Sequence, residues 1–225
     1  MNYNVLQPNF ELRAVSREQL KGVWGKMALA ILVYYLITIL PQFIFWEYGL
    51  NIPFLNTLVS IAIVIISGPI TLGLAGYFLR RIRGEEIFIE NIFDGFKRFL
   101  PSFLLTLLMG LFVFLWALLL IIPGIIKGYG YSMAFYIMYD NPGIKPLDAL
   151  KKSQNMMKGY KGKYFLLGLS FLGWSLLGIL TLGIGYLWLT PYVSLAYGNF
   201  YENLKKHQEE AVTEDKRPDA GQNIA

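Results

Sequence analysis

The sequence predicts an all-α protein, a polytopic transmembrane helical bundle, and three observations lead to this fold class. First, the 225 residues are 55% hydrophobic and 16% charged, with a mean hydropathy of +0.46. Soluble domains carry about 25% charged residues, so the composition argues against a water-soluble protein. Second, the apolar residues come in long runs, and about 20 residues suffice to cross a bilayer as a helix. Third, the basic residues cluster on alternate connections between these runs.

Six apolar runs are expected to cross the membrane, with short breaks rich in Pro, Gly or Asn between them. The runs cover residues 24–46, 54–79, 100–122, 124–139, 164–182 and 185–204. Residues 1–205 are therefore expected to form a single transmembrane domain. Residues 206–225 are polar and charged, so we expect a disordered cytoplasmic tail.

The placement of lysine and arginine predicts the orientation of the chain. Of the 20 basic residues, 19 lie before or at the start of the first run, between runs two and three, between runs four and five, or in the tail. The three opposite connections contain none of them. Because cytoplasmic connections carry an excess of Lys and Arg, both termini are expected in the cytoplasm.

The segments that precede runs one, three and five carry apolar residues at helical spacing, which is typical of helices lying in the membrane interface. These apolar positions are Leu12, Val15, Leu20, Ile89, Ile92, Phe93, Phe96, Leu147, Leu150, Met156 and Met157. The alternative is that each segment is an ordinary cytoplasmic extension of the next helix.

An internal repeat relates these segments. The pattern S-x4-K-G-x2-G-K occurs at residues 16–26 and again at 153–163. A shift of 62 residues aligns Phe103 with Phe165, and a shift of 122 residues aligns Pro69 with Pro191. We therefore expect about six spans arranged as three parallel hairpins, each preceded by a cytoplasmic interfacial amphipathic helix.

Five lysines in the two copies of the motif are candidate contacts for anionic lipid head groups: Lys21, Lys26, Lys158, Lys161 and Lys163. Each basic residue beside an anionic leaflet contributes about 1 kcal/mol to membrane binding. A phosphate-binding loop is excluded, because no Ser or Thr follows the second lysine and no strand is predicted before it. The alternative is that the lysines only anchor the topology.

Lys127 is the candidate intramembrane functional residue, because it alone among the basic residues falls outside the cytoplasmic segments. One interpretation is that its ammonium group extends to the outer interface. The other places it inside the bundle, near Tyr129, Tyr131 or Ser132, with Glu47 as the candidate acidic partner. A lysine at the bilayer centre costs about 3 kcal/mol on insertion scales, so the second position requires partners.

No enzymatic chemistry is expected. The chain has no cysteine, and its one histidine, His207, lies in the charged tail, which argues against thiolate or histidine metal sites and catalytic triads. No paired carboxylates for acid–base catalysis are evident either. We therefore expect no catalytic, cofactor-binding or metal-binding residues, no cofactor, and no binding of nucleic acid.

Several short motifs resemble a known family. They lie at residues 122–127, 131–133, 140–142, 153–159, 170–174 and 191–192. These resemble the bacterial integral-membrane family catalogued as domain of unknown function 975. The resemblance implies a multi-pass protein of the bacterial cell membrane and no established activity. The family is similar in pattern to membrane domains attached to some glycerophosphodiester phosphodiesterases, which suggests a lipid-related setting.

The function that these observations favour is binding, moving or sensing lipids or other amphiphiles at the cytoplasmic leaflet. Membrane lipids, anionic ones above all, are the expected partners, and the sequence indicates no particular protein partner. One alternative is a small-solute permease or channel with a polar path among Lys127, Ser132, Ser170, Ser175 and Thr190. Another is an accessory subunit of a membrane complex. A lateral groove would favour lipid binding, and a continuous water-filled cavity would favour the permease.

Overall fold

The computed structural model describes residues 6–47 and 53–215, and in these ranges the chain is largely helical and contains no strand. The prediction of an all-α fold is therefore confirmed. The elements are α1 (Asn9–Leu20), α2 (Trp24–Thr38), α3 (Leu40–Glu47), α4 (Pro53–Ile82), the 3-10 helix η1 (Ile89–Arg98), α5 (Phe99–Leu119), α6 (Ile121–Tyr131), α7 (Ala134–Asp140), α8 (Pro146–Met156), α9 (Lys161–Leu169), α10 (Leu172–Leu180) and α11 (Tyr186–Asp215).

Three helical stretches in the described ranges are long and apolar enough to cross a membrane: Phe54–Ile82, Ile89–Leu119 and Lys161–Leu180. They coincide with the second, third and fifth expected spans. A fourth candidate is the pair α1 and α2, which is bent by 98° between its two helices. The structure is thus compatible with a membrane protein, while the expected count of six spans is not confirmed.

The first and fourth expected spans are interrupted. The first is divided between α2 and α3 at Ile39, and the fourth is divided between α6 and α7 after Tyr131. The break expected at Pro123 lies instead at Leu120, which has extended backbone angles (φ −159°, ψ 137°). Pro123 is tolerated in the first turn of α6, because the backbone N–H that proline lacks would have no helical partner there.

The sixth expected span lies within α11, which continues to Asp215. Residues 206–215, expected to be disordered, are therefore helical, and residues 216–225 lie outside the described ranges. Extending a helix that has already formed needs no new nucleus. The Lys and Glu residues of this segment also have high helix propensity, so its polarity does not end the helix.

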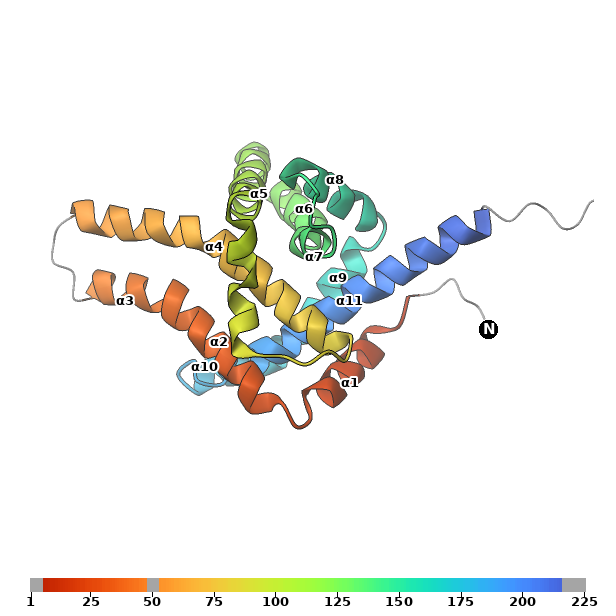
Figure 1. Cartoon of the computed structure of the whole chain (residues 1–225), viewed down its shortest axis with the longest axis horizontal. Coiled ribbons are helices and arrows are strands. Elements are labelled where there is room, and N and C mark those ends of the chain that lie inside the picture. The colour runs from red at the N-terminus through yellow and green to blue at the C-terminus, as the bar shows by residue number, and fades with distance from the viewer. Residues whose placement is uncertain (1–5, 48–52, 216–225) are drawn as a thin grey trace, which may run out of the picture.

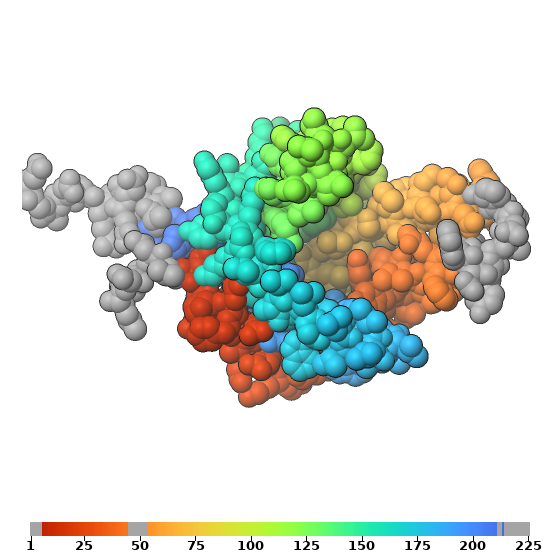
Figure 2. Space-filling model, turned by 180° about the vertical axis from the view of Figure 1, so that it is seen from behind, coloured from red at the N-terminus to blue at the C-terminus, as the bar shows by residue number. Residues whose placement is uncertain are grey.

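Three apolar lobes extend from a common centre. Figure 1 shows α3 and the first half of α4 extending in one direction and α5 with α6 in another. Figure 2 shows the region around α10 (blue) as a third lobe. Residues near the lobe ends are highly exposed, including Phe54 (68%), Ile121 (74%) and Leu182 (94%). Extensive apolar surface of this kind is typical of contact with lipid tails rather than water.

The order of elements repeats three times, and we call each repeat a unit. A unit consists of an amphipathic helix (α1, η1 or α8), an apolar segment (α2–α3, α5 or α9–α10) and a return segment (α4, α6–α7 or α11). Each amphipathic helix packs on the return segment of another unit: α1 on α11, η1 on α4, and α8 on α6 and α7 (Figure 1). These contacts close a ring of three units.

The contact of η1 with α4 depends on glycines. A Cβ at Gly73 would collide with the backbone of Ile92, and a Cβ at Gly95 would collide with the carbonyl oxygen of Pro69. The missing side chains let the two backbones approach closely. As a result Ile92 is fully buried in the protein core.

Most of the apolar stripe residues are covered by protein. Leu12, Leu20, Leu150 and Met156 are all buried in the core. The stripes expected to lie on the membrane interface are thus accounted for largely by packing between units.

Some aromatic side chains of the second unit stay exposed. Phe93, Phe96 and the neighbouring Phe99 form a ladder of rings whose successive centroids are 6.2 and 6.4 Å apart. Neighbouring helices therefore cover Ile92 but leave these three rings open to the surroundings.

The repeated sequence motif has a matching structure in its two copies. Its first glycine adopts a left-handed conformation each time, with φ +75° at Gly22 and +85° at Gly159, which glycine tolerates best. Its serine is buried each time and hydrogen-bonded to another unit. Ser16 Oγ accepts from the side chain of Asn199 (3.0 Å), and Ser153 Oγ donates to the carbonyl of Gly130 (2.8 Å).

Candidate functional site

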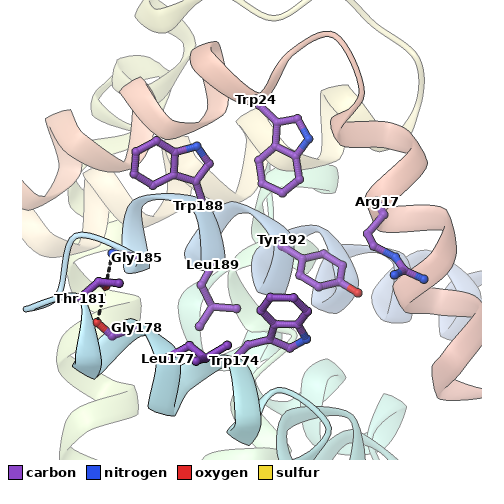
Figure 3. Close-up of a pocket in the computed structure, with 10 residues that line it drawn as sticks. All are labelled: Arg17, Trp24, Trp174, Leu177, Gly178, Thr181, Gly185, Trp188, Leu189 and Tyr192. Atoms are coloured by element: carbon purple, nitrogen blue, oxygen red, sulfur yellow. Dashed lines mark hydrogen bonds between the residues drawn. The ribbon is translucent and has the colours of Figure 1, made fainter.

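A groove of about 530 Å³ lies where the first and third units meet. We call it the tryptophan groove, because three of the five tryptophans of the chain line it. Its lining residues are Arg17 of α1, Trp24 of α2, Trp174, Leu177 and Gly178 of α10, Thr181, Gly185, and Trp188, Leu189 and Tyr192 of α11. Figure 3 shows the three indole rings around the groove and Arg17 at one end of it.

The turn between α10 and α11 forms the other end of the groove. Thr181 Oγ1 donates to the carbonyl of Gly178 and accepts from the N–H of Gly185, both at 2.8 Å (Figure 3). Gly183 contributes to the turn with φ +89°. A Cβ at Gly185 would lie only 3.1 Å from the Cα of Gly178. Gly178 and Gly185 thus let α10 and the start of α11 approach closely, and the indole rings form the walls of the groove.

The Arg17 end of the groove is positively charged. Arg17 is exposed and makes no ion pair among the residues that the structure describes. The hydroxyl of Tyr192 points toward it (Figure 3). Arg13, one turn earlier on α1, donates to the carbonyl of Ser170 at 3.2 Å, and its buried Nε has no hydrogen-bond partner within the described ranges. The groove thus combines an apolar aromatic wall with an exposed cation.

The candidate lysines differ in their surroundings. Lys21 forms a solvent-exposed pair with Glu18 (2.8 Å). Lys163 has a structural contact, because its ammonium group donates to the carbonyl of Leu6 at 2.6 Å. The other three are exposed or partly exposed: Lys26, Lys158 and Lys161.

Lys127 lies on α6 with its Nζ 4.6 Å from the centre of the Trp116 ring of α5. This is the geometry of a cation–π contact. The side chain is partly exposed, and its contact with Trp116 involves none of the hydroxyl groups considered as partners. The side chain of Glu47, the candidate acidic partner, lies outside the described residues.

The polar residues of the permease alternative lie in different places. Ser132 and Thr190 line a second cavity, of about 290 Å³, which we call the central cavity. Ser170 and Ser175 instead donate to nearby carbonyl oxygens of the third unit, at 2.6 and 3.1 Å. With Lys127 against a tryptophan ring, these five residues do not line one cavity.

An ion-pair cluster joins the three return segments. Arg83, just after α4, binds Asp140 of α7 (2.7 Å) and Glu202 of α11 (2.6 Å), and Lys205 of α11 also binds Asp140 (2.7 Å). Tyr201 donates a further hydrogen bond to Asp140 at 2.9 Å. The shift of 62 residues relates Asp140 to Glu202, and the shift of 122 relates Arg83 to Lys205. Equivalent positions of the repeat therefore form the cluster.

The fold and the groove together define the class of protein: an all-helical chain with helices of membrane length and a lateral aromatic groove that has a cationic end. Comparison with known protein families identifies the family of the chain. The chain belongs to the family described as Protein of unknown function (DUF975), which matches residues 1–127 and 118–208. The resemblance seen in the sequence is thereby confirmed. No curated protein and no solved structure matches the chain.

Sequence reasoning did not single out Arg17 or Trp188, and it did not group Trp24, Trp174 and Tyr192 into one site. Arg17 resembles the other basic residues of the cytoplasmic segments, and tryptophan is common near span ends for topological reasons. The signal that the sequence offered was the presence of tryptophan in both its first and its last third. The convergence of these residues depends on packing between units, which periodicity does not reveal.

We predict that Asp140→Asn destabilises the protein through the ion-pair cluster. Burial raises the pKa of Asp140, but hydrogen bonds from Lys205, Arg83 and Tyr201 outweigh burial and lower the pKa below its ordinary value of 3.8. Hydrogen bonds to charged groups contribute about 1.5–3 kcal/mol, so the free energy of unfolding in detergent should fall by about this amount at neutral pH.

The stability difference between the wild type and Asp140→Asn should depend on pH. A carboxyl group with a lowered pKa stabilises the fold above its unfolded pKa, and the contribution is lost as the pH falls through the folded value. The difference between wild type and Asp140→Asn should therefore be constant near neutral pH and shrink below about pH 4. Glu18→Gln, in an exposed pair with Lys21, is the matched control and should change stability by less than about 1 kcal/mol. Equal effects of the two variants would contradict the assignment.

Proposed function

We propose that the protein is a multi-pass membrane protein that binds, and thereby senses or moves, lipids with an anionic head group at the cytoplasmic leaflet. The observation that carries the proposal is the tryptophan groove, with the exposed Arg17 at one end. The proposal includes no enzymatic step. Among the ten described residues that line the groove there is no carboxylate or histidine that could act as a general base, and the hydroxyl group of Thr181 is hydrogen-bonded within the turn.

The size and lining of the groove support an amphiphile as its occupant. A volume of about 530 Å³ falls within the usual range for ligand sites, about 300–1,000 Å³. Leu177, Leu189 and the indole rings offer an apolar wall for an acyl chain. Arg17 offers a planar group of N–H donors that matches phosphate or carboxylate oxygens. An anionic lipid meets both requirements at once.

The proposed membrane placement has six crossings in three parallel hairpins and puts the ion-pair cluster in the cytoplasm with both termini. The asymmetry of Lys and Arg along the chain supports this orientation. It sets Arg17 at the level of the cytoplasmic head groups and the α10–α11 turn at the outer surface.

The candidate lysines have a supporting part in the proposal. Lys21, Lys26, Lys158 and Lys161 would lie near the same leaflet as Arg17, where each basic side chain adds electrostatic attraction to anionic lipid. Lys163 is not assigned to lipid binding, because its ammonium group already donates a hydrogen bond to the backbone carbonyl of Leu6. The lysines would raise the local concentration of anionic lipid, and the groove would select one molecule.

We predict that Arg17→Gln and Trp174→Leu each reduce the anionic lipid that co-purifies with the protein. For Arg17→Gln, the loss of a charge-assisted contact corresponds to about tenfold weaker binding. Trp174→Leu removes one of the indole rings that form the apolar wall of the groove. Native mass spectrometry from a mild detergent measures the bound lipid directly. Both substitutions affect exposed side chains, so the protein should still fold.

Two variants serve as matched controls for this experiment. Lys206→Gln removes an exposed cation of α11 that does not line the groove, and Trp116→Leu removes an indole of α5. Both should keep the lipid content of the wild type. Retention of only neutral lipids by the wild type, or full retention of anionic lipid by Arg17→Gln and Trp174→Leu, would overturn the proposal.

We predict the orientation to be visible by labelling single cysteines, which the cysteine-free chain makes simple. Leu182→Cys lies at an almost fully exposed lobe end, and Glu86→Cys and Lys152→Cys lie at exposed positions near η1 and on α8. A membrane-impermeant maleimide added to intact cells should react at position 182, and at 86 and 152 only after lysis. Reaction at 86 or 152 in intact cells would contradict the orientation.

A further inference from the structure

The central cavity lies where all three units meet. Its walls come from α2 and α4 of the first unit, α7 of the second, and α9 and α11 of the third. Its volume of about 290 Å³ is at the lower end of the range for ligand sites. It shares no lining residue with the tryptophan groove in the part of the chain that the structure describes. The cavity is therefore a separate site, and it suits a small molecule rather than a lipid with its acyl chains.

Most residues that line this cavity carry a hydroxyl group, although most of the exposed lining surface is apolar. Eight of its 13 lining residues are Ser, Thr or Tyr, and all three units contribute them. Each hydroxyl group can both donate and accept hydrogen bonds. Phe78 and Phe135 add flat apolar surfaces to the wall. The lining thus combines many two-way hydrogen-bonding groups with aromatic faces.

Some of these hydroxyl groups already have partners in the protein, and others do not. Thr190 pairs with the hydroxyl of Tyr35 at 2.8 Å, and Ser132 donates to a backbone carbonyl at 2.8 Å. The side chains of Thr71, Tyr136 and Ser194 make no hydrogen bond with the part of the chain that the structure describes. A hydroxyl group away from bulk water gains stability when it is hydrogen-bonded, so these three are available to a bound molecule.

The charge of the lining restricts the chemistry of that molecule. No Asp, Glu, Lys or Arg is found among the 13 described residues that line the cavity. The nearby ion-pair cluster is internally paired, because its two acidic and two basic side chains bind one another. An ion brought into the cavity would lose part of its hydration without gaining a counter-charge, which is costly. A neutral molecule would avoid this cost.

From these observations we infer that the central cavity binds a small, uncharged, polyhydroxylated molecule, of the polyol or monosaccharide class. Its hydroxyl groups would exchange hydrogen bonds with Thr71, Tyr136 and Ser194, and its C–H faces would pack on the aromatic rings. This site goes beyond the proposed lipid groove and does not depend on it. The inference assigns binding alone, with no bond made or broken.

The cavity is connected to the ion-pair cluster through stacked rings. Tyr136 lines the cavity and stacks on Tyr201, with ring centroids 5.3 Å apart and planes inclined by 19°. Tyr201 in turn donates its hydroxyl hydrogen to Asp140 of the cluster at 2.9 Å. The stack holds the ring of Tyr136 in place, so the polar group that it offers to a ligand is pre-positioned.

The test is a titration of the purified full-length protein with xylitol and with glucose, followed by saturation-transfer NMR and calorimetry. Gluconate and choline serve as charged probes of similar size. We expect saturable binding of at least one neutral probe and no saturable binding of the charged ones. The double variant Thr71→Val/Ser194→Ala should bind that probe about tenfold more weakly, because it loses two hydrogen bonds to the ligand.

The control variant is Thr106→Val, which removes a hydroxyl group of α5 that donates to the backbone carbonyl of Ser102 and does not line the cavity. It should bind the neutral probe as the wild type does. Absence of saturable binding for both neutral probes would overturn the inference. So would unchanged binding by a folded double variant, or tighter binding of choline, which would indicate an aromatic site for cations.

Discussion

The packing of each amphipathic helix on the return segment of another unit is the constraint on which the rest of the structure depends. The contacts of α1 with α11, η1 with α4, and α8 with α6 and α7 join three units whose apolar lobes extend in different directions. They bury the apolar stripes of the amphipathic helices in a shared core. Without these contacts the core that all three units share would not form.

Closure of this ring explains where the two sites lie. The contact that joins the first and third units brings α1 and α2 beside α10 and α11, so Arg17 and Trp174 line one groove although they are far apart in the sequence. The centre of the same ring is the central cavity, which all three units line. The two sites differ because the groove has an arginine at its end, whereas the cavity has no charged residue among its described lining residues and most of them carry a hydroxyl group.

The charged residues of the ion-pair cluster follow the internal repeat of the sequence. The cluster of Arg83, Asp140, Glu202 and Lys205 joins all three return segments. Its members fall at equivalent positions of the repeat, so three similar segments carry complementary charges at their point of contact. Within the described residues these pairs do not include Arg17, whose guanidinium group stays available to a ligand. The lipid proposal depends on this difference between the cluster and Arg17.

Much of the local structure could be predicted from the sequence. Apolar composition and span length predicted the helical class. The motif that repeats in the sequence also recurs as a matching local structure, with a positive φ that favours glycine at Gly22 and Gly159. The pattern of apolar stripes also located α1, η1 and α8. These features are local, since they depend on the chemistry of a few neighbouring residues.

The features that could not be predicted depend on contacts between distant segments. Apolar periodicity does not reveal whether a stripe faces lipid or another helix, so the burial of Leu12 and Leu150 was not foreseen. The break at Leu120 replaced the one expected at Pro123, because proline is compatible with the first turn of a helix. The tryptophan groove was missed for the same reason as the buried stripes, since it forms only when the ring closes.

The central claim is that the tryptophan groove holds one anionic lipid with its head group at Arg17. The most direct measurement is photo-crosslinking in native membranes with an anionic phospholipid that carries a diazirine in its acyl chain, followed by mapping of the modified residues by mass spectrometry. The account predicts adducts concentrated on groove residues such as Trp174, Leu177 and Trp188, and their loss in Arg17→Gln. Adducts spread over the exposed ends of all three lobes, with none enriched in the groove and no change in Arg17→Gln, would contradict it.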